Sequence, residues 1–164
     1  TPSTAGGNYT QNAASFGVYI LTSRTTGQNY AEMGTQNNPA GTAAADLYPW
    51  FTDNKIYYEI NANGVGVSAP ANAQGMYVVS RTASNAIAVY RNGSSFSTAS
   101  TASVANPNQT FYIMATHGGS NNVVSRSGDK LSAAFIGGSM NATEAGNLST
   151  RINAYMTALS INVY

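Results

Sequence analysis

Short apolar runs separated by polar residues divide the chain into predicted β-strands. Because side chains alternate between the two faces of a strand, an alternating run predicts a half-buried strand, and a run apolar on both faces predicts a fully covered one. Runs of the second kind span 15–23 and 110–116. We expect 29–34 to return beside 15–23 as a hairpin. Further strands are predicted over 55–61, 76–82, 86–91, 95–103, 123–124 and 130–137.

Residues 76–94 form the predicted centre of an antiparallel sheet. The two runs of this stretch flank a small polar break, and the second run ends on Asn92-Gly93, a dipeptide that tolerates the positive φ angles of a type I′ hairpin. Alternation places Ile87 and Val89 on one face and Ala88 and Tyr90 on the other. We expect the inward-facing core to include Ile87, Val89, Phe111, Ile113, Phe135 and Ile136.

A single helix is predicted late in the sequence, over about 142–159. Asn141 is a good N-cap, and Glu144 stands at the N3 position of a capping box. Apolar residues then recur every three or four positions, which places them on one helix face toward the sheet. They are Ala145, Leu148, Ile152, Tyr155, Met156 and Leu159. Short strands with one late helix predict an all-β sandwich covered by an amphipathic helix.

The composition narrows the classes of partner. The 164 residues fit one domain, and only 8% of them are charged, against about 25% in an average soluble domain. A net charge of +1 without a Lys/Arg cluster provides no electrostatic footprint for nucleic acid. No apolar run approaches the length of a membrane span, so membrane insertion is not expected. The chain has no Cys, so thiols do not indicate in which redox compartment the protein functions.

An aromatic segment, Asp46–Phe51, follows a low-complexity stretch over 36–45 that is predicted to be a surface loop. It contains the only Trp of the chain, Trp50, beside Tyr48 and Phe51. Aromatic faces pair with the C–H faces of saccharides, so the segment is a candidate sugar platform. The favoured alternative is a buried cluster that closes one end of the sandwich, because large aromatic side chains are mostly buried.

The succession of strand and turn motifs resembles laminin-G-like, concanavalin-A-like lectin domains, especially those at the C-terminal end of phage tail and other virion proteins. The matching segments are Ser15-Phe-Gly-Val-Tyr, Met76-Tyr-Val-Val-Ser-Arg-Thr, Ala88-Val-Tyr-Arg-Asn-Gly, Phe111-Tyr-Ile, Ala133-Ala-Phe-Ile-Gly-Gly, Met140-Asn-Ala-Thr-Glu-Ala and Tyr155-Met-Thr-Ala-Leu. The match extends in order over most of the chain, and the matching residues are mainly core and turn positions. The resemblance implies an antiparallel jelly-roll β-sandwich that often binds glycans at its loop rim.

From the resemblance we expect a non-enzymatic, lectin-like module of a virion or a secreted surface protein, hence an extracellular or virion location. Its partner is then a cell-surface or polymeric glycan, with self-association or other virion proteins as further partners. The alternative is a structural virion or filament subunit that assembles with copies of itself and binds no sugar. The residues predicted to bind the ligand are Tyr48, Trp50, Phe51, His117, Asn121 and Asn122.

Catalytic and metal signatures are weak. Glycoside hydrolysis needs two carboxyl groups across the scissile bond, and the carboxylates of this chain are scattered singly, which disfavours a glycan hydrolase. His117 is the only histidine, and a turn role is favoured over catalysis. Lectins of this fold commonly hold Ca²⁺ through loop oxygens, for which Asp46, Asp53, Asn54 and Asp129 are candidates. No spacing supports them, so ordinary turn carboxylates are favoured, and no other cofactor is expected.

The resemblance begins partway into the family domain, because further strands precede the Ser-Phe-Gly-Val-Tyr strand in the family. We expect 1–14 to be an extended arm that contributes little core and 15–164 to be the sandwich, short of its first strands. A strand at 15–23 that is apolar on both faces is costly at an uncovered edge. We therefore expect this edge to be completed by a neighbouring copy, a partner protein or a further N-terminal segment.

Overall fold

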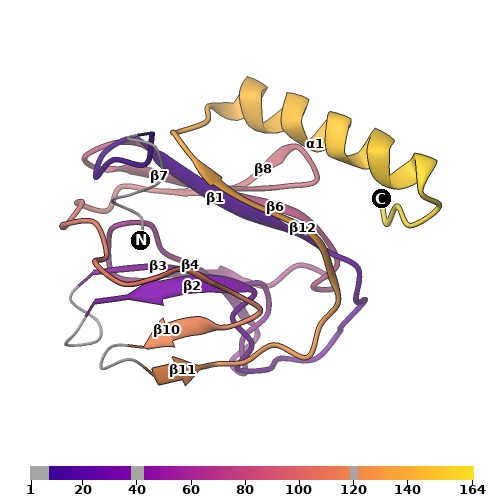
Figure 1. Cartoon of the computed structure of the whole chain (residues 1–164), viewed down its shortest axis with the longest axis horizontal. Helices are drawn as coiled ribbons and strands as arrows, with labels where there is room; N and C mark the ends of the chain where they lie inside the picture. The colour runs from indigo at the N-terminus through magenta and orange to yellow at the C-terminus, as the bar shows by residue number, and fades with distance from the viewer. Residues whose placement is uncertain (1–7, 38–42, 119–121) are drawn as a thin grey trace.

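The chain forms two β-sheets packed face to face, with one helix on the outer side of the smaller sheet (Figure 1). The structure, a computed structural model, describes residues 8–37, 43–118 and 122–164. The five-stranded sheet contains β1 (Ala14–Ile20), β6 (Gly75–Ala83), β7 (Ala86–Arg91), β8 (Ser94–Ala99) and β12 (Leu131–Gly137). The seven-stranded sheet contains β2 (Met33–Gln36), β3 (Ala44–Tyr48), β4 (Lys55–Tyr58), β5 (Val65–Ser68), β9 (Tyr112–Ile113), β10 (Thr116–Gly118) and β11 (Asn122–Val124). These layers confirm the predicted β-sandwich with one late helix.

Strand β1 lies inside the five-stranded sheet, whose order is β12-β1-β6-β7-β8. It pairs antiparallel with β12 on one side and with β6 on the other, and all seven of its residues are buried. The expectation that a neighbouring copy, a partner protein or a further N-terminal segment completes the edge of this strand is therefore wrong. The pairing comes from β12, a strand far along the same chain, and it satisfies the backbone groups that an edge strand leaves free.

The hairpins at the centre of this sheet follow the predicted pattern. Asn92 and Gly93 have φ angles of 52° and 82°, and this two-residue turn joins β7 to β8. Positive φ at both positions is what a type I′ turn requires. The faces of β7 also alternate as expected, with Val89 in the core between the sheets and Tyr90 packed toward the helix.

The seven-stranded sheet has the order β11-β10-β2-β3-β4-β5, and β9 pairs with β2. Its strands pair antiparallel except for β10 and β2, which run parallel. The predicted hairpin between 15–23 and 29–34 does not form, because β2 belongs to the opposite sheet. After β1 the chain crosses between the sheets, and buried Arg24 holds the crossing segment by donating to Asp129 and to the carbonyl of Trp50.

Two other predicted segments differ from the structure. The expected strand 110–116 is interrupted because Met114 takes a φ of 62°, which ends β9, and its amide donates to the Glu32 carbonyl. The interruption leaves Ile113 56% exposed, so its predicted place in the core is wrong. The predicted loop at 36–45 contains the start of β3 at Ala44. The short strand β5 lies in a segment for which no strand was predicted.

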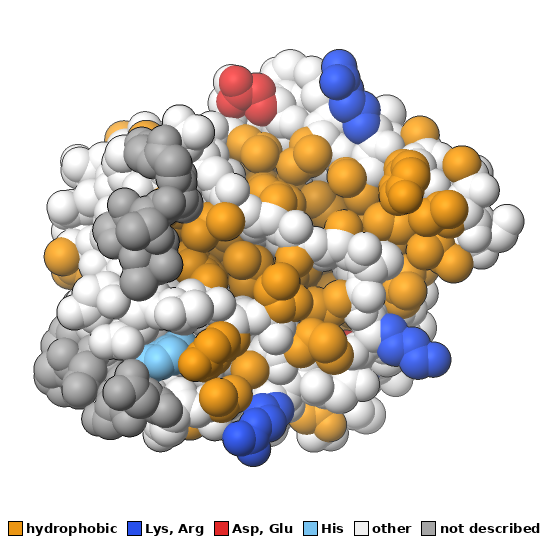
Figure 2. Space-filling model, in the orientation of Figure 1, with side chains coloured by type: hydrophobic (Ala, Val, Ile, Leu, Met, Phe, Trp, Pro, Cys, Tyr) orange, Lys and Arg blue, Asp and Glu red, His pale blue; other side chains and the backbone are white. Residues whose placement is uncertain are grey.

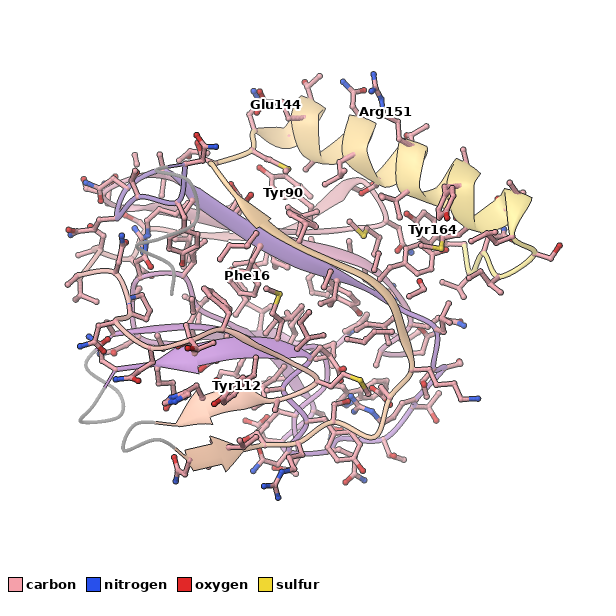
Figure 3. The ribbon with its side chains drawn as sticks, viewed as in Figure 1. Phe16, Tyr90, Tyr112, Glu144, Arg151 and Tyr164 are labelled. Atoms are coloured by element: carbon pink, nitrogen blue, oxygen red, sulfur yellow. The ribbon has the colours of Figure 1, made fainter. Side chains whose placement is uncertain are left out.

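The main core fills the space between the two sheets. Figure 3 shows Phe16 pointing into this space, where its ring lies 5.5 Å from that of Phe111. Tyr9, which precedes β1, is only 3% exposed and donates to the Asn61 side chain at 2.9 Å. The predicted N-terminal arm therefore contributes a core residue, because burying an aromatic ring stabilises the fold and its hydroxyl finds an acceptor.

A second core lies between the five-stranded sheet and α1 (Ala142–Ala158). Asn141 caps the helix through a complete capping box with Glu144, as predicted. Phe135, predicted to face the other sheet, packs here instead, and Tyr90 lies beneath the helix (Figure 3). Of the predicted apolar stripe, Ala145, Leu148, Ile152 and Met156 pack in this layer, whereas Tyr155 and Leu159 are exposed. Within the described ranges, no helix has the length and hydropathy to cross a membrane.

Candidate ligand-binding pocket

The outer face of the seven-stranded sheet carries an unusual set of side chains on β3 and β4. Leu47 of β3 and Tyr58 of β4 face the main core. Side chains alternate between the two faces of a strand, so the residues next to Leu47 and next to Tyr58 face outward. These outward residues are Asp46 and Tyr48 on β3 and Tyr57 on β4, with Glu59 directly after it.

A pocket of about 220 Å³ opens on this face. Gln36, Tyr48 and Tyr57 come from strands, Glu59 directly follows β4, and Asn29 and Phe51 come from loops. The described residues that line it are Asn29, Gln36, Tyr48, Phe51, Tyr57 and Glu59. The pocket therefore has three aromatic rings, two side-chain amides and one carboxyl group.

The three rings form a continuous aromatic wall. Phe51 lies edge-to-face against Tyr48, with ring centroids 5.6 Å apart, and against Tyr57, with centroids 5.5 Å apart. Tyr48 and Tyr57 are also paired residues of β3 and β4. Tyr57 lies across Gly66 of β5, where an added Cβ would come within 2.7 Å of its ring. Gly66 thus leaves room for the Tyr57 ring, because it has no Cβ.

Asp46 and Glu59 lie opposite each other on neighbouring strands. Each backbone amide donates to the carbonyl of the other residue, at 3.1 and 2.9 Å, which makes them a hydrogen-bonded cross-strand pair. The Asp46 side chain is fully buried, and its two oxygens accept hydrogen bonds from Thr116 and from Gln36. Gly34 leaves room for the contact between Asp46 and Thr116, because a Cβ there would collide with both. Glu59 is the acid that lines the pocket.

Burial raises the pKa of both carboxyl groups. The pKa of Glu59 rises to about 8, first through burial and second through the nearby Asp46 carboxylate. Burial also raises the pKa of Asp46 to about 7, although its hydrogen bonds act in the opposite direction. At neutral pH the Glu59 carboxyl group is therefore mostly protonated, and it can donate a hydrogen bond as well as accept one.

A buried ion cluster fixes the loop that carries Phe51. Arg24 lies between Asp129 and Glu32, with nitrogen–oxygen distances of 3.0 and 3.8 Å, and also donates to the Trp50 carbonyl at 2.9 Å. The pKa of Glu32 is raised to about 8, by burial first and then by Asp129. Because Trp50 directly precedes Phe51, the ion cluster fixes the position of Phe51 in the aromatic wall.

The structure places the predicted ligand-binding residues in different surroundings. Tyr48 and Phe51 line the pocket, whereas Trp50 is half-buried outside the lining and donates its indole N–H to Asn54 at 3.1 Å. His117 is 3% exposed on β10, with its ring 5.0 Å from that of Tyr112. The exposed Asn122 begins β11. Asn121 lies outside the described residues.

The candidate calcium ligands do not converge. Asp46 is held by Thr116 and Gln36, and Asp129 by Arg24. Asp53 accepts from Tyr57 at 2.9 Å and pairs with Lys55 at 3.4 Å. In the part of the chain that the structure describes, no three His, Cys, Asp or Glu side chains gather as metal ligands. The carboxylates are not all isolated, however, because Asp46 and Glu59 meet across strands.

Four pocket residues were missed by the sequence analysis: Asn29, Gln36, Tyr57 and Glu59. The alternation over 55–61 already placed Tyr57 and Glu59 on one face, which was the available signal. The register between β3 and β4, which brings Glu59 to Asp46, is set by backbone pairing that the sequence pattern does not reveal.

Comparison with known proteins supports the fold of the chain but assigns it to no family. No family model matches the chain, and no curated protein matches it. Among solved structures, the binding domain of botulinum neurotoxin serotype G is similar, with a TM-score of 0.56 and 13% sequence identity. The match covers 87% of this chain and 37% of the neurotoxin domain, so it spans about a third of that structure. The likeness supports the β-sandwich fold.

Proposed function

We propose that the protein is a non-enzymatic, lectin-like binding module and that the pocket between β3, β4 and the Phe51 loop holds one sugar ring. The observation that carries the proposal is the combination of three aromatic rings with two amides and a carboxyl group in one cavity. Saccharide recognition uses this chemistry, because ring C–H faces stack on aromatics while hydroxyls bond to amides and carboxyls. The pocket lies on a sheet face, whereas the family resemblance implies the loop rim.

The size and chemistry of the pocket support a small polar ligand. Pockets for drug-sized molecules have volumes of about 300–1,000 Å³. A cavity of about 220 Å³ is smaller, which suits a single ring or the end of a glycan chain. Asp46 has both oxygens engaged, so Glu59 is the one acid of the pair that faces a ligand. Two free carboxyl groups, which hydrolysis requires, are thus not presented together.

The location and the partner of the protein are part of the same proposal. The neurotoxin structure is a binding domain, which loosely supports a binding role for a similar fold. The resemblance to domains of phage tails supports a place on a virion or on a secreted surface protein, with a cell-surface or polymeric glycan as partner. The few charged residues favour recognition through neutral hydrogen bonds and stacking.

A glycan array with three variants tests the proposal. Tyr57→Ala removes one ring of the pocket, and we expect it to abolish glycan retention because stacking on that ring is lost. Tyr155→Ala removes an exposed ring on α1 and is the matched control, expected to bind as the wild type does. Trp50→Ala should retain binding, since Trp50 stands outside the lining. No bound glycan, or equal binding by Tyr57→Ala, would overturn the proposal.

Exposed apolar residues favour a second candidate, a subunit that associates with its own copies. Figure 2 shows hydrophobic side chains gathered across one face, where charged side chains are few and lie apart. Large exposed apolar residues of the described part are Ile113, Met114, Val123, Tyr155, Leu159 and Ile161. Apolar patches of this kind mark interaction surfaces. Light scattering on the purified chain tests this candidate, and a monomer at high concentration that still binds glycan would exclude it.

A further inference from the structure

The pocket combines a carboxyl group with aromatic faces, and none of the described residues that line it is basic. Two carboxyl groups, Glu59 in the lining and Asp46 behind it, stand together on β3 and β4. Lys55, on the same face of β4, is 3.4 Å from Asp53 and so already has a counter-charge. The pocket thus has acid groups without a cation of its own.

The aromatic wall adds a second attraction for positive charge. The faces of Phe and Tyr rings carry the negative part of the ring quadrupole, which attracts ammonium groups within about 6 Å of the ring centre. Phe51 lies edge-to-face with Tyr48 and Tyr57, so the rings stand at steep angles of 89° and 83° to it. Faces turned in different directions around one small cavity, with an acid beside them, match the usual surroundings of a bound alkylammonium group.

We infer that the ligand of this pocket is an amino sugar whose free amine is protonated, with the ammonium group seated between Glu59 and the aromatic wall. This inference rests on the proposed function, because it specifies the sugar that the same pocket takes. An N-acetylated or neutral sugar of the same shape lacks the positive charge that these groups attract. The expected preference is at least tenfold in affinity for the amine over either analogue.

Proton exchange accompanies such binding. The pKa of Glu59 is raised to about 8, so the acid is mostly protonated in the empty pocket at neutral pH. A cation favours the ionised form, and its arrival therefore releases a proton. The groups that face Glu59 are Asp46 across the strand pair, Tyr48 and Tyr57 in the wall, and Gln36 on β2. Of these, Asp46 also titrates near neutral pH and shifts in the same direction.

Four oligosaccharides with one β-1,4-linked glucose backbone provide the test. They carry a hydroxyl, an N-acetyl, a free amine or a trimethylammonium group at C2, and calorimetry measures their affinities between pH 6 and pH 9. The trimethylammonium form keeps its charge at every pH, so its pH profile reports on the protein alone. We expect its affinity to rise by up to tenfold per pH unit below pH 8 and then level off, with a proton released on binding.

Two variants that each replace one carboxyl group with an amide, and so have equal net charge, test the role of Glu59. Glu59→Gln should lose the preference for the amine and keep binding to the neutral sugar, because the amide still forms hydrogen bonds. Glu144→Gln, in the helix capping box, makes the same change far from the pocket and should keep the preference. If Glu59→Gln fails to fold, the wild-type pH profile and proton release still decide the matter.

The outcomes separate this inference from the proposed function. Equal or tighter binding of the hydroxyl or N-acetyl form overturns the amine preference and leaves a sugar-binding module. Binding of none of the four also overturns it, and the glycan array then decides independently whether another sugar is bound. A preference for the amine that survives Glu59→Gln would place the ammonium group elsewhere and overturn the assignment to this pocket.

Discussion

The Nε atom of Arg81 donates a hydrogen bond to the carbonyl oxygen of Ile60 at 2.8 Å, where the two sheets meet. Arg81 belongs to β6 of the five-stranded sheet, whereas Ile60 follows β4 of the seven-stranded sheet, and neither residue is exposed. The same guanidinium group also donates to the carbonyls of Ala83, Ser84 and Thr101. One buried side chain thus satisfies backbone acceptors from three segments.

We predict that Arg81→Met destabilises the fold by about 2–4 kcal/mol, because it leaves buried carbonyls without donors while removing the cost of burying a charge. Arg151→Met on the exposed face of α1 is the control, expected to stay within about 0.5 kcal/mol of the wild type. Urea denaturation of both variants measures the two free energies. Equal losses would show that the Arg81 bonds contribute nothing beyond an ordinary substitution.

Phe16 is fully buried in the main core, whereas Ile113 is mostly exposed. Phe16→Ala should cost about 3–5 kcal/mol, since it removes a fully buried ring and leaves a cavity between the sheets. Ile113→Ala should cost less than about 0.5 kcal/mol, because that side chain is mostly exposed. Chemical denaturation distinguishes them, and a large loss at Ile113 would restore the uninterrupted inner strand predicted over 110–116.

The buried carboxyl groups should make the protein less stable as the pH rises. Asp46 has an ordinary pKa of 3.8 and a folded pKa of about 7, so between these values the folded state binds more protons than the unfolded state. The free energy of unfolding therefore falls between about pH 4 and pH 7, by up to ~4 kcal/mol for this group. Glu59, with a folded pKa of about 8, continues the fall to higher pH.

Melting temperatures measured from pH 4 to pH 9 test this dependence. Asp46→Asn keeps the shape of the side chain and removes its titration, so its stability should change less with pH than that of the wild type. Thr157→Ala, on the exposed side of α1, should keep the wild-type slope. A melting temperature that rises toward pH 8, or an unchanged slope in Asp46→Asn, contradicts the prediction.

Gly66 offers a way to move the aromatic wall without removing a ring. Gly66→Ala places a Cβ against Tyr57, and we expect the displaced ring to lower glycan affinity about tenfold or more while the chain still folds. The matched control is Gly137→Ala on β12, where an added Cβ meets nothing within 4 Å. Affinity and melting temperature are measured together, and unchanged affinity in Gly66→Ala would remove Tyr57 from the site.

The parts of the fold that were predictable depend on neighbours in sequence. Asn92-Gly93 specified its hairpin through backbone conformation alone, and Asn141 with Glu144 specified the start of α1 through two reciprocal hydrogen bonds. Strand alternation likewise separated the two faces of β7. Local backbone preferences determine these features, so the sequence pattern contains them.

The parts that were missed depend on partners far along the chain. β2 resembled the return strand of a hairpin, yet Arg24 and Asp129, which lie more than a hundred positions apart, direct the preceding segment to the other sheet. Met114 breaks an apolar run through contacts with Glu32 and Ser127. The pocket shows the same dependence, since the pKa of Glu59 is raised first by burial in the folded sheet and second by Asp46, which strand register brings beside it.

The position of β1 between β6 and β12 has a consequence for biosynthesis. The ribosome makes Ala14–Ile20 more than a hundred residues before it makes the partner strand Leu131–Gly137. Until then a strand that is buried at every position in the finished fold has one side unpaired, and sheets built from such distant segments fold slowly. We therefore expect the nascent chain to depend on chaperone protection, and a shortened product ending before Leu131 to aggregate.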